Sequence, residues 1–249
     1  MRERVLALGD FFFRWRSYLP LVLLPVLVVA IARFRHPFQS RDAELAWEAG
    51  SLLVALVGLA GRVWTVGVTP RGTSGRNTRQ QKAAVLNTTG PYSIIRHPLY
   101  VANGLIALGF ALFTHTWLAP PVVAVAALAY YACIIQREEA FLRERFGPAF
   151  DAWAARTPAM LPRSWHYVPS ERAFDGRKAL RGEFYAFALV LTMPLVLDII
   201  EDVLTESHVT PDGIWVVTAV LGMVTFVAVR FLKKHSTVLT ATAPKDDAS

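Results

Sequence analysis

Two polar segments of the chain hold residues whose types and spacing suit catalysis. The first runs from Thr69 to His97 and closes with Arg96-His97-Pro98 before an apolar run. Its glycines and small polar residues, gathered in 72–78, predict a structured loop whose backbone N–H groups can bind a polar ligand. Pro98 suits the first turn of a helix, which would place Arg96 and His97 at the partly positive helix N-terminus. The alternative is that both residues only flank a membrane span.

The second segment carries two neighbouring carboxylates in a helical pattern. Glu139 has Arg143 at position i+4, so an ordinary surface ion pair is expected for Glu139. Glu138 has Ile134 at i−4, which places Glu138 on the apolar stripe of the helix. A carboxylate there needs a cation from elsewhere, or it would be protonated. That cation is either Arg96, in a structural ion pair, or a ligand.

The sequence lacks the common motifs of other catalytic and ligand-binding sites. Motifs of dinucleotide-binding domains, P-loops, serine hydrolases and zinc proteases are all missing. The one cysteine, Cys133, excludes an intramolecular disulfide and a cysteine-based zinc site. We therefore expect no metal. Five scattered histidines are interpreted as interfacial residues rather than ligands: His36, His115, His166, His208 and His235.

The elements that must position these residues are apolar helices. The chain has 249 residues, of which 54% are hydrophobic and 18% are charged, which excludes disorder and argues against an ordinary soluble domain. Arg62 lies within an apolar stretch, from which it reaches either the membrane interface or a buried anionic group. Six stretches approach the length of a membrane span. They are Tyr18–Ala32, Leu45–Val68, Leu99–Ala119, Pro120–Ile135, Phe184–Ile200 and Ile214–Leu232.

A short turn joins the third and fourth stretches, which predicts a helical hairpin. We therefore predict an all-α fold: a polytopic transmembrane helix bundle of about six spans, with a cytoplasmic cofactor pocket. Lys and Arg gather in the N-terminal segment, in 69–97, after Ile135 and in the tail, whereas the loop after Ile200 holds acidic residues only. This bias predicts that both termini are cytoplasmic. It also explains the net charge of +7 without a nucleic-acid partner.

The order of these features resembles the superfamily of isoprenylcysteine carboxyl methyltransferases and phospholipid methyltransferases, which are integral membrane enzymes. The resemblance covers about Leu45 to Pro162. It divides the chain into an N-terminal segment with the first span (1–44), a methyltransferase-like membrane core (45–163), and a cytoplasmic linker with two further spans and a tail (164–249). Its motifs are Gly90-Pro91-Tyr92, Arg96-His97-Pro98-x-Tyr100, the hairpin, Glu138-Glu139, Phe146-Gly147 and Leu161-Pro162.

The resemblance implies a methyltransferase that uses S-adenosylmethionine (SAM), held between the cytosolic loop and the helix after the hairpin. Glu138 would meet the charged amino end of SAM. The position at which the prenylcysteine enzymes carry a substrate-binding arginine looks like Ile134 here. The loop 73–78 is similar to bacterial members proposed to methylate lipid phosphates, and this resemblance implies a bacterial inner membrane. By position, the cofactor-binding residues would be Leu86, Asn87, Tyr92, His97, Pro98, Leu99, Tyr100, Glu138 and Glu139.

Methyl transfer to an anionic oxygen requires alignment of the reacting atoms but no general base. Arg76 and Arg96 are the predicted catalytic residues, because guanidinium groups orient an anionic head group by paired hydrogen bonds. The expected partner is therefore a membrane lipid or lipidated substrate with a phosphate or carboxylate. Two alternatives stay open. One is an NADPH-dependent membrane reductase of the sterol type, which has a similar Arg/His-Pro-x-Tyr turn, and the other is a non-enzymatic membrane scaffold.

Overall fold

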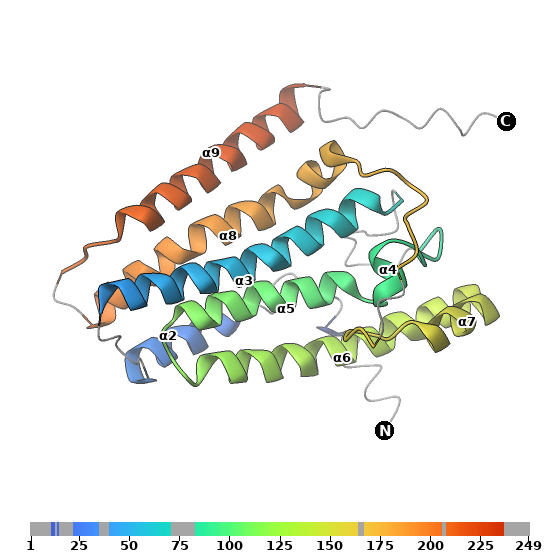
Figure 1. Ribbon diagram of the computed structural model, residues 1–249, viewed down its shortest axis with the longest axis horizontal. Coiled ribbons are helices and arrows are strands. Elements are labelled where there is room, and N and C mark those ends of the chain that lie inside the picture. The colour runs from blue at the N-terminus through green and yellow to red at the C-terminus, as the bar shows by residue number, and fades with distance from the viewer. Residues whose placement is uncertain are drawn as a thin grey trace.

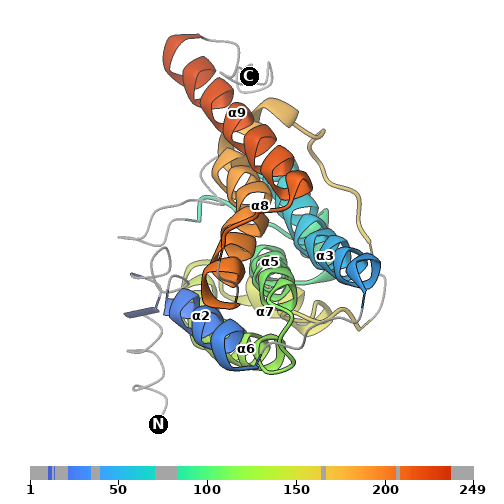
Figure 2. The same cartoon turned by 90° about the vertical axis from the view of Figure 1, so that its left-hand side faces the viewer.

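The computed structural model describes residues 11–12, 14, 22–34, 40–70, 83–163, 167–205 and 208–236. Within these ranges every regular element is a helix, which confirms the predicted all-α class. The long helices lie roughly alongside one another (Figure 1). Seen from one end, α9 lies at one edge and α2 and α6 at the other (Figure 2). The helices are α2 (Leu23–Phe34), α3 (Arg41–Val68), α4 (Pro91–Ile94), α5 (Pro98–Phe113), α6 (Ala119–Phe146), α7 (Pro148–Arg156), α8 (Gly176–Thr205) and α9 (Gly213–His235).

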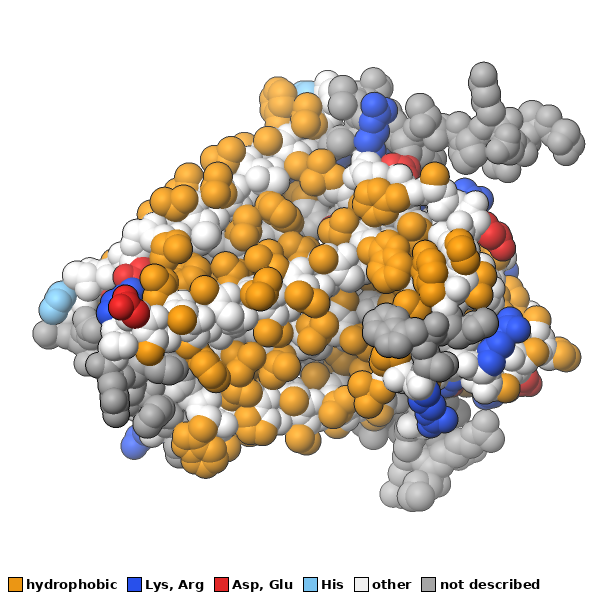
Figure 3. Space-filling view, in the orientation of Figure 1, with side chains coloured by type: hydrophobic (Ala, Val, Ile, Leu, Met, Phe, Trp, Pro, Cys, Tyr) orange, Lys and Arg blue, Asp and Glu red, His pale blue; other side chains and the backbone are white. Residues whose placement is uncertain are grey.

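Each predicted apolar stretch overlaps a helix. Three of the described helices, α3, α6 and α9, are long and apolar enough to cross a membrane, with 28, 28 and 23 residues. The apolar helices α2 and α5 are shorter, at 12 and 16 residues. Hydrophobic side chains cover the middle of the face in Figure 3, and charged side chains lie toward its ends. This distribution is typical of a membrane protein, whereas six spans remain a prediction.

The helical hairpin forms as predicted, with one correction at its turn. Helix α5 ends at Phe113, and Ala119 begins α6 rather than ending the preceding helix. The turn between them includes His115 at φ +53°, a left-handed backbone conformation that breaks the helix. Helix α6 then continues without interruption to Phe146 and stops at Gly147, which has φ +52°. The two glutamates therefore lie on a helix that extends beyond its apolar part, as predicted.

Helices α3 and α5 approach each other closely because two glycines face the partner backbone. A Cβ atom on Gly58 of α3 would lie 2.6 Å from the carbonyl oxygen of Ala102. A Cβ atom on Gly109 of α5 would lie 2.7 Å from the carbonyl oxygen of Ser51. Small residues at such contacts let helix backbones pack closely where apolar solvent gives little driving force for association. The α3–α5 pair is therefore a tightly fitted unit.

Arg62 of α3 contacts a buried anionic partner within the protein. Of the two alternatives for Arg62, the membrane interface and a buried anionic group, the structure therefore shows the second. Its Nε donates to Glu183 of α8 at 2.6 Å, its Nη2 donates to the same carboxylate at 3.1 Å, and its Nη1 donates to Asn103 of α5. The two charged side chains are only 18% and 5% exposed. Three helices meet at this pair, so α8 is tied to the core by a buried charge.

Loss of one partner from this pair should destabilise the protein strongly. Glu183→Gln leaves the Arg62 guanidinium buried without its counter-charge, and we expect the free energy of unfolding to fall by about 3–5 kcal/mol. Unfolding of detergent-purified protein by heat or denaturant measures this loss. The matched control is Asp151→Asn, which breaks the pair of Arg143 and Asp151, whose side chains are 49% and 56% exposed. That control should cost less than about 1 kcal/mol. Equal losses of unfolding free energy in the two variants would show that the buried pair of Arg62 and Glu183 stabilises the protein no more than an exposed surface pair does.

Candidate functional site

Those predicted site residues that the structure describes gather at the end of the bundle where α5 begins. Helix α4, the start of α5, the last turns of α6 and helix α7 lie at this end in Figure 1. The chain reaches α5 through Ile95, Arg96 and His97, which are not helical. Two backbone hydrogen bonds fix this segment against the residues after α7. The N–H groups of Arg96 and His97 donate to the carbonyl oxygens of Pro158 at 2.8 Å and Ala159 at 3.0 Å.

Arg96 connects three elements through its guanidinium group. Its Nε donates to Glu139 of α6 at 2.8 Å, and its Nη1 donates to the carbonyl oxygens of Ala154, at 3.0 Å, and Thr157. These contacts hold the start of α5, the extension of α6 and the end of α7 together. Several donors of Arg96 are thus used within the protein. Its predicted role in orienting a substrate stays a prediction.

His97 is buried between the two glutamates. Its Nε2 lies 3.1 Å from Glu139 Oε1, and its Nδ1 lies 3.6 Å from Glu138 Oε2. Burial lowers the pKa of His97, but the hydrogen bonds and negative charges of Glu138 and Glu139 outweigh it, so the pKa lies above its ordinary value. The two carboxylates thus favour the protonated form of His97, and that form reduces the repulsion between them.

Glu138 lies at the accessible side of this cluster, beside a stack of aromatic rings. The Tyr100 hydroxyl donates to Glu138 Oε2 at 2.9 Å. The Tyr100 ring stacks on His97 on one side and on Tyr131 on the other, with ring centroids 5.6 and 5.0 Å apart. The Glu138 side chain is 31% exposed, compared with 16% for Glu139. An oriented, accessible carboxylate can bind a cationic group through charge-assisted hydrogen bonds.

The structure corrects the expected partner of Glu139. Arg143, its neighbour at i+4, instead pairs with Asp151 of α7 at 2.8 Å. Arg96, considered as a structural partner of Glu138, pairs with Glu139. Helical spacing could not reveal this, because the partner lies 43 residues earlier, on another element.

Three other predicted residues, Leu86, Asn87 and Tyr92, line a pocket of about 90 Å³. Burial and the nearby charge of Glu138 both raise the pKa of the Tyr92 hydroxyl. Tyr92 therefore lies between this pocket and the carboxylate cluster, and it connects the two groups of predicted residues. The pocket is otherwise formed by Val68, Thr69, Pro70, Val85, Thr88, Thr89, Ser170, Glu171 and Arg172.

The remaining predicted residues lie as follows. Pro98 is buried and Leu99 is half-buried in the first turn of α5. Arg76 lies outside the described residues, as do its polar neighbours Asn77 and Gln80.

Sequence reasoning missed the contribution of the segment before α8, which it treated as a linker. The carbonyl oxygen of Val168 accepts from the N–H of Gly90 at 2.8 Å, and the N–H of Val168 donates to Ser93 Oγ at 2.9 Å. Ser170 lines the pocket beside Tyr92. Single serines and a valine form no motif, so no signal in the sequence could have assigned them to the site.

An apolar helical bundle with a polar, partly accessible cluster at one end has the form of a membrane enzyme, and sequence comparisons define its family. The sequence model of the family "Phospholipid methyltransferase" matches residues 51–149, which include most of the candidate site. The chain belongs to this family, within the superfamily that also contains the isoprenylcysteine methyltransferases, as the resemblance predicted. It is therefore a membrane methyltransferase.

Three relatives show the range of this similarity. The nickel-cobalt-cadmium resistance protein NccN of Alcaligenes xylosoxydans xylosoxydans is 31% identical over 156 residues, which cover 63% of this chain and 68% of NccN. The cobalt-zinc-cadmium resistance protein CzcN of Cupriavidus metallidurans is 43% identical over 83 residues, or 33% of this chain and 38% of CzcN. Protein-S-isoprenylcysteine O-methyltransferase of Schizosaccharomyces pombe is 26% identical over 85 residues, which cover 34% of this chain and 36% of that enzyme. The chain thus spans little more than a third of the last two relatives. No solved structure matches.

The two glutamates should differ in what their loss does to stability. Glu139→Gln removes the partner of Arg96 and His97, and we expect a loss of about 2–4 kcal/mol in the free energy of unfolding. Glu138→Gln keeps an acceptor for Tyr100 and should cost less than about 1 kcal/mol. Thermal unfolding of both purified variants tests the difference. A larger loss for Glu138→Gln would contradict the assignment of Glu139 as the structural carboxylate.

The raised pKa of His97 also predicts a pH dependence. The folded protein binds this proton more tightly than the unfolded chain, whose His97 has a pKa near the ordinary value of 6.5. The stabilisation is therefore fully present below pH 6.5 and is lost as the pH rises through the pKa of the folded state. Thermal unfolding from about pH 6 to about pH 9 should show this decline, and His97→Gln should lack it. An identical decline in the variant would assign it to other groups.

Proposed function

We propose that the protein transfers the methyl group of SAM to an anionic oxygen of a membrane lipid head group, at the cytoplasmic face. The observation that carries this proposal is the accessible Glu138 carboxylate, oriented by Tyr100 and flanked by stacked aromatic rings. It lies within the region that matches the methyltransferase family. The proposed orientation, with both termini and this end of the bundle in the cytoplasm, rests on the distribution of Lys and Arg.

The cationic groups of SAM suit this arrangement. SAM carries an ammonium group and a sulfonium group, and an accessible carboxylate can pair with the ammonium group through charge-assisted hydrogen bonds. We assign Glu138 to the ammonium end. Leu86, Asn87 and Tyr92 line the adjoining pocket, and Pro70 and Val85 border it, on either side of the undescribed stretch 71–82. A pocket of about 90 Å³ does not hold a whole nucleoside, so SAM would extend beyond this pocket. Arg76 stays the predicted residue that orients the acceptor.

An anionic oxygen is the acceptor that the chemistry favours. A lone pair of the oxygen forms the new O–CH₃ bond while the C–S bond breaks, and its electron pair stays on sulfur to give a neutral thioether. No proton is released, so no general base is needed. The charged reactants neutralise each other, and a site that excludes water favours this step. An amine acceptor would first have to lose a proton to a general base. His97 is held between two carboxylates, which raise its pKa and favour the form that already carries a proton.

The named relatives fit an anionic acceptor. One relative is an O-methyltransferase, and two are named for resistance to divalent metal ions. Methylation of a phosphate or carboxylate removes one negative charge from the membrane surface. Because anionic head groups attract divalent cations, this loss of charge would reduce metal accumulation at the membrane. We therefore propose that lipid methylation serves metal tolerance.

Methyl transfer with a labelled donor tests the proposal. The full chain, reconstituted with SAM that carries a labelled methyl group, should label lipid in vesicles that contain anionic lipids. Mass spectrometry of the labelled lipid should locate the methyl group on a phosphate or carboxylate oxygen and not on nitrogen. Glu138→Gln should weaken SAM binding by about 100-fold, since a charged partner of a desolvated cation is lost. Calorimetry measures this binding.

The controls separate the alternatives. Glu144→Gln changes an exposed carboxylate on the same helix and should bind SAM normally. Arg76→Lys should bind SAM but methylate slowly, because lysine keeps the charge and loses the paired donors. Label on the nitrogen of phosphatidylethanolamine would replace the anionic acceptor with an amine. Stabilisation by NADPH and not by SAM would favour the reductase, and stabilisation by neither would favour a scaffold.

A further inference from the structure

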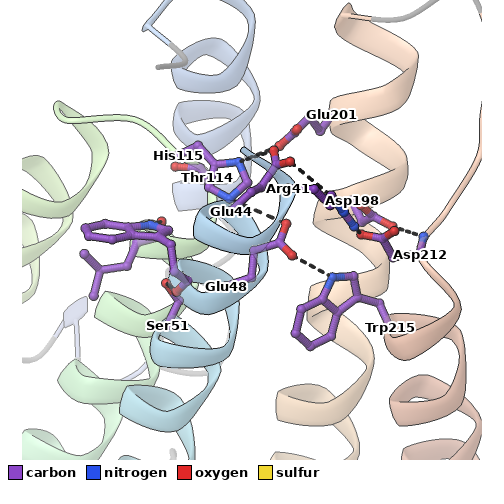
Figure 4. A network of polar contacts seen from close by, with 12 residues as sticks. Arg41, Glu44, Glu48, Ser51, Thr114, His115, Asp198, Glu201, Asp212 and Trp215 are labelled. Carbon is purple, nitrogen blue, oxygen red and sulfur yellow. Dashed lines mark hydrogen bonds and ion pairs between the residues drawn. The ribbon is translucent and has the colours of Figure 1, made fainter. Parts of the chain in front are cut away.

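A second polar cluster lies at the opposite end of the bundle, where the described chain turns between α5 and α6. His115 of this turn is surrounded by carboxylates from α3 and α8 (Figure 4). Its side chain is 0% exposed. The interpretation of His115 as an interfacial residue is therefore wrong, because its imidazole is enclosed by protein.

The distances around His115 resemble those of a metal site. Its Nδ1 lies 3.2 Å from Glu201 Oε2 and 3.8 Å from Glu44 Oε1. When each of the three residues supplies one ligand atom, a ring nitrogen or a carboxylate oxygen, these atoms all lie within 4.8 Å of one another. In a tetrahedral site with metal–ligand bonds of about 2.1 Å, two ligand atoms are about 3.4 Å apart. The observed distances lie on either side of this value, so one ion could contact all three atoms after small side-chain shifts.

The other nitrogen of His115 faces a third carboxylate. Its Nε2 lies 3.5 Å from Glu48 Oε1. Glu48 is itself held in place by the Trp215 indole, whose Nε1 donates to Glu48 Oε2 at 3.1 Å. Histidines that bind metal ions commonly donate their second N–H to a carboxylate, which fixes the tautomer and the ring orientation. Glu48 has the position of such an orienting residue.

The adjoining acidic residues do not form an equivalent site. Glu48, Asp198 and Asp212 also lie close together, but they offer carboxylates alone. Arg41 contacts Asp212 and also donates to Glu44 at 3.0 Å. Both groups therefore contact the Arg41 guanidinium, and the group with His115 is distinguished by its imidazole nitrogen.

We propose that Glu44, His115 and Glu201 bind one divalent transition-metal ion, with Glu48 as the residue that orients His115. One imidazole with two carboxylates suits ions of the Zn²⁺, Co²⁺ and Ni²⁺ class. Ca²⁺ needs six to eight oxygen ligands, and Mg²⁺ keeps several waters, so neither matches this set. The ion would join α3, the α5–α6 turn and α8 at this end. The proposal is independent of the methyl acceptor and of SAM.

Titration of the chelator-treated full chain with Co²⁺ alone tests the proposal. Co²⁺ in a site of low symmetry absorbs visible light strongly, so binding has its own spectrum. We expect one Co²⁺ per chain, displacement by Zn²⁺, and a higher unfolding temperature in the presence of either ion. Mg²⁺ and Ca²⁺ should neither displace Co²⁺ nor raise the unfolding temperature. No methyl-transfer activity enters these measurements, so a failed proposal here would leave the proposed function untouched.

Variants localise the site. His115→Gln should weaken Co²⁺ binding at least 100-fold, and Glu48→Gln should weaken it about 10- to 100-fold through loss of orientation. His235→Gln, which changes an exposed histidine at the end of α9, is the matched control and should bind normally. If His115→Gln does not fold, Glu201→Gln serves as the second ligand variant. Absence of saturable Co²⁺ binding in the unaltered chain overturns the proposal, as does unchanged binding in folded His115→Gln or Glu201→Gln.

Discussion

The contact between Arg96 and Glu139 is the constraint on which the candidate methyl-transfer site depends. Both side chains are largely buried, so an ion pair between them is strong and neither partner can be removed without leaving an uncompensated charge. The same guanidinium donates to carbonyl oxygens at the end of α7. The start of α5 and the extension of α6 are therefore fixed relative to each other, although they belong to helices that lead away into the apolar part of the bundle.

Because of this ion pair, the two adjacent glutamates differ in role: one stabilises the structure, and the other is accessible to a ligand. Because Glu139 satisfies Arg96 and His97, Glu138 does not need to act as their main counter-charge. Glu138 is instead the more exposed carboxylate, and Tyr100 orients it. Neighbours on a helix point about 100° apart, so one residue can face the protein and the next can face a ligand. A pair of acidic residues in the sequence thus encodes one structural and one accessible carboxylate.

Local sequence patterns predicted the helices, the hairpin and the extension of α6, because hydrophobic runs and glycine or proline boundaries act within a few residues. The family resemblance, in turn, predicted that Tyr92, His97, Tyr100 and Glu138 belong to one site. Partners across the bundle could not be predicted in this way. The Glu139–Arg96 and Arg62–Glu183 pairs join positions 43 and 121 residues apart, and no spacing rule links such positions. The carboxylates around His115 were missed for the same reason, since α3, the hairpin turn and α8 each supply one part.

Helix α5 connects the two polar ends of the molecule. Its first residue follows His97, and its last residue lies two positions before His115, so 16 residues of helix, about 24 Å long, separate the two clusters. Gly58 and Gly109 hold α5 against α3 at distances that leave no room for a side chain. A ligand at one end therefore cannot influence the other end by sliding α5 along α3. Coupling between the ends would instead act through the shared stability of the α3–α5 unit, because Tyr100 at one end and Glu44 at the other belong to it.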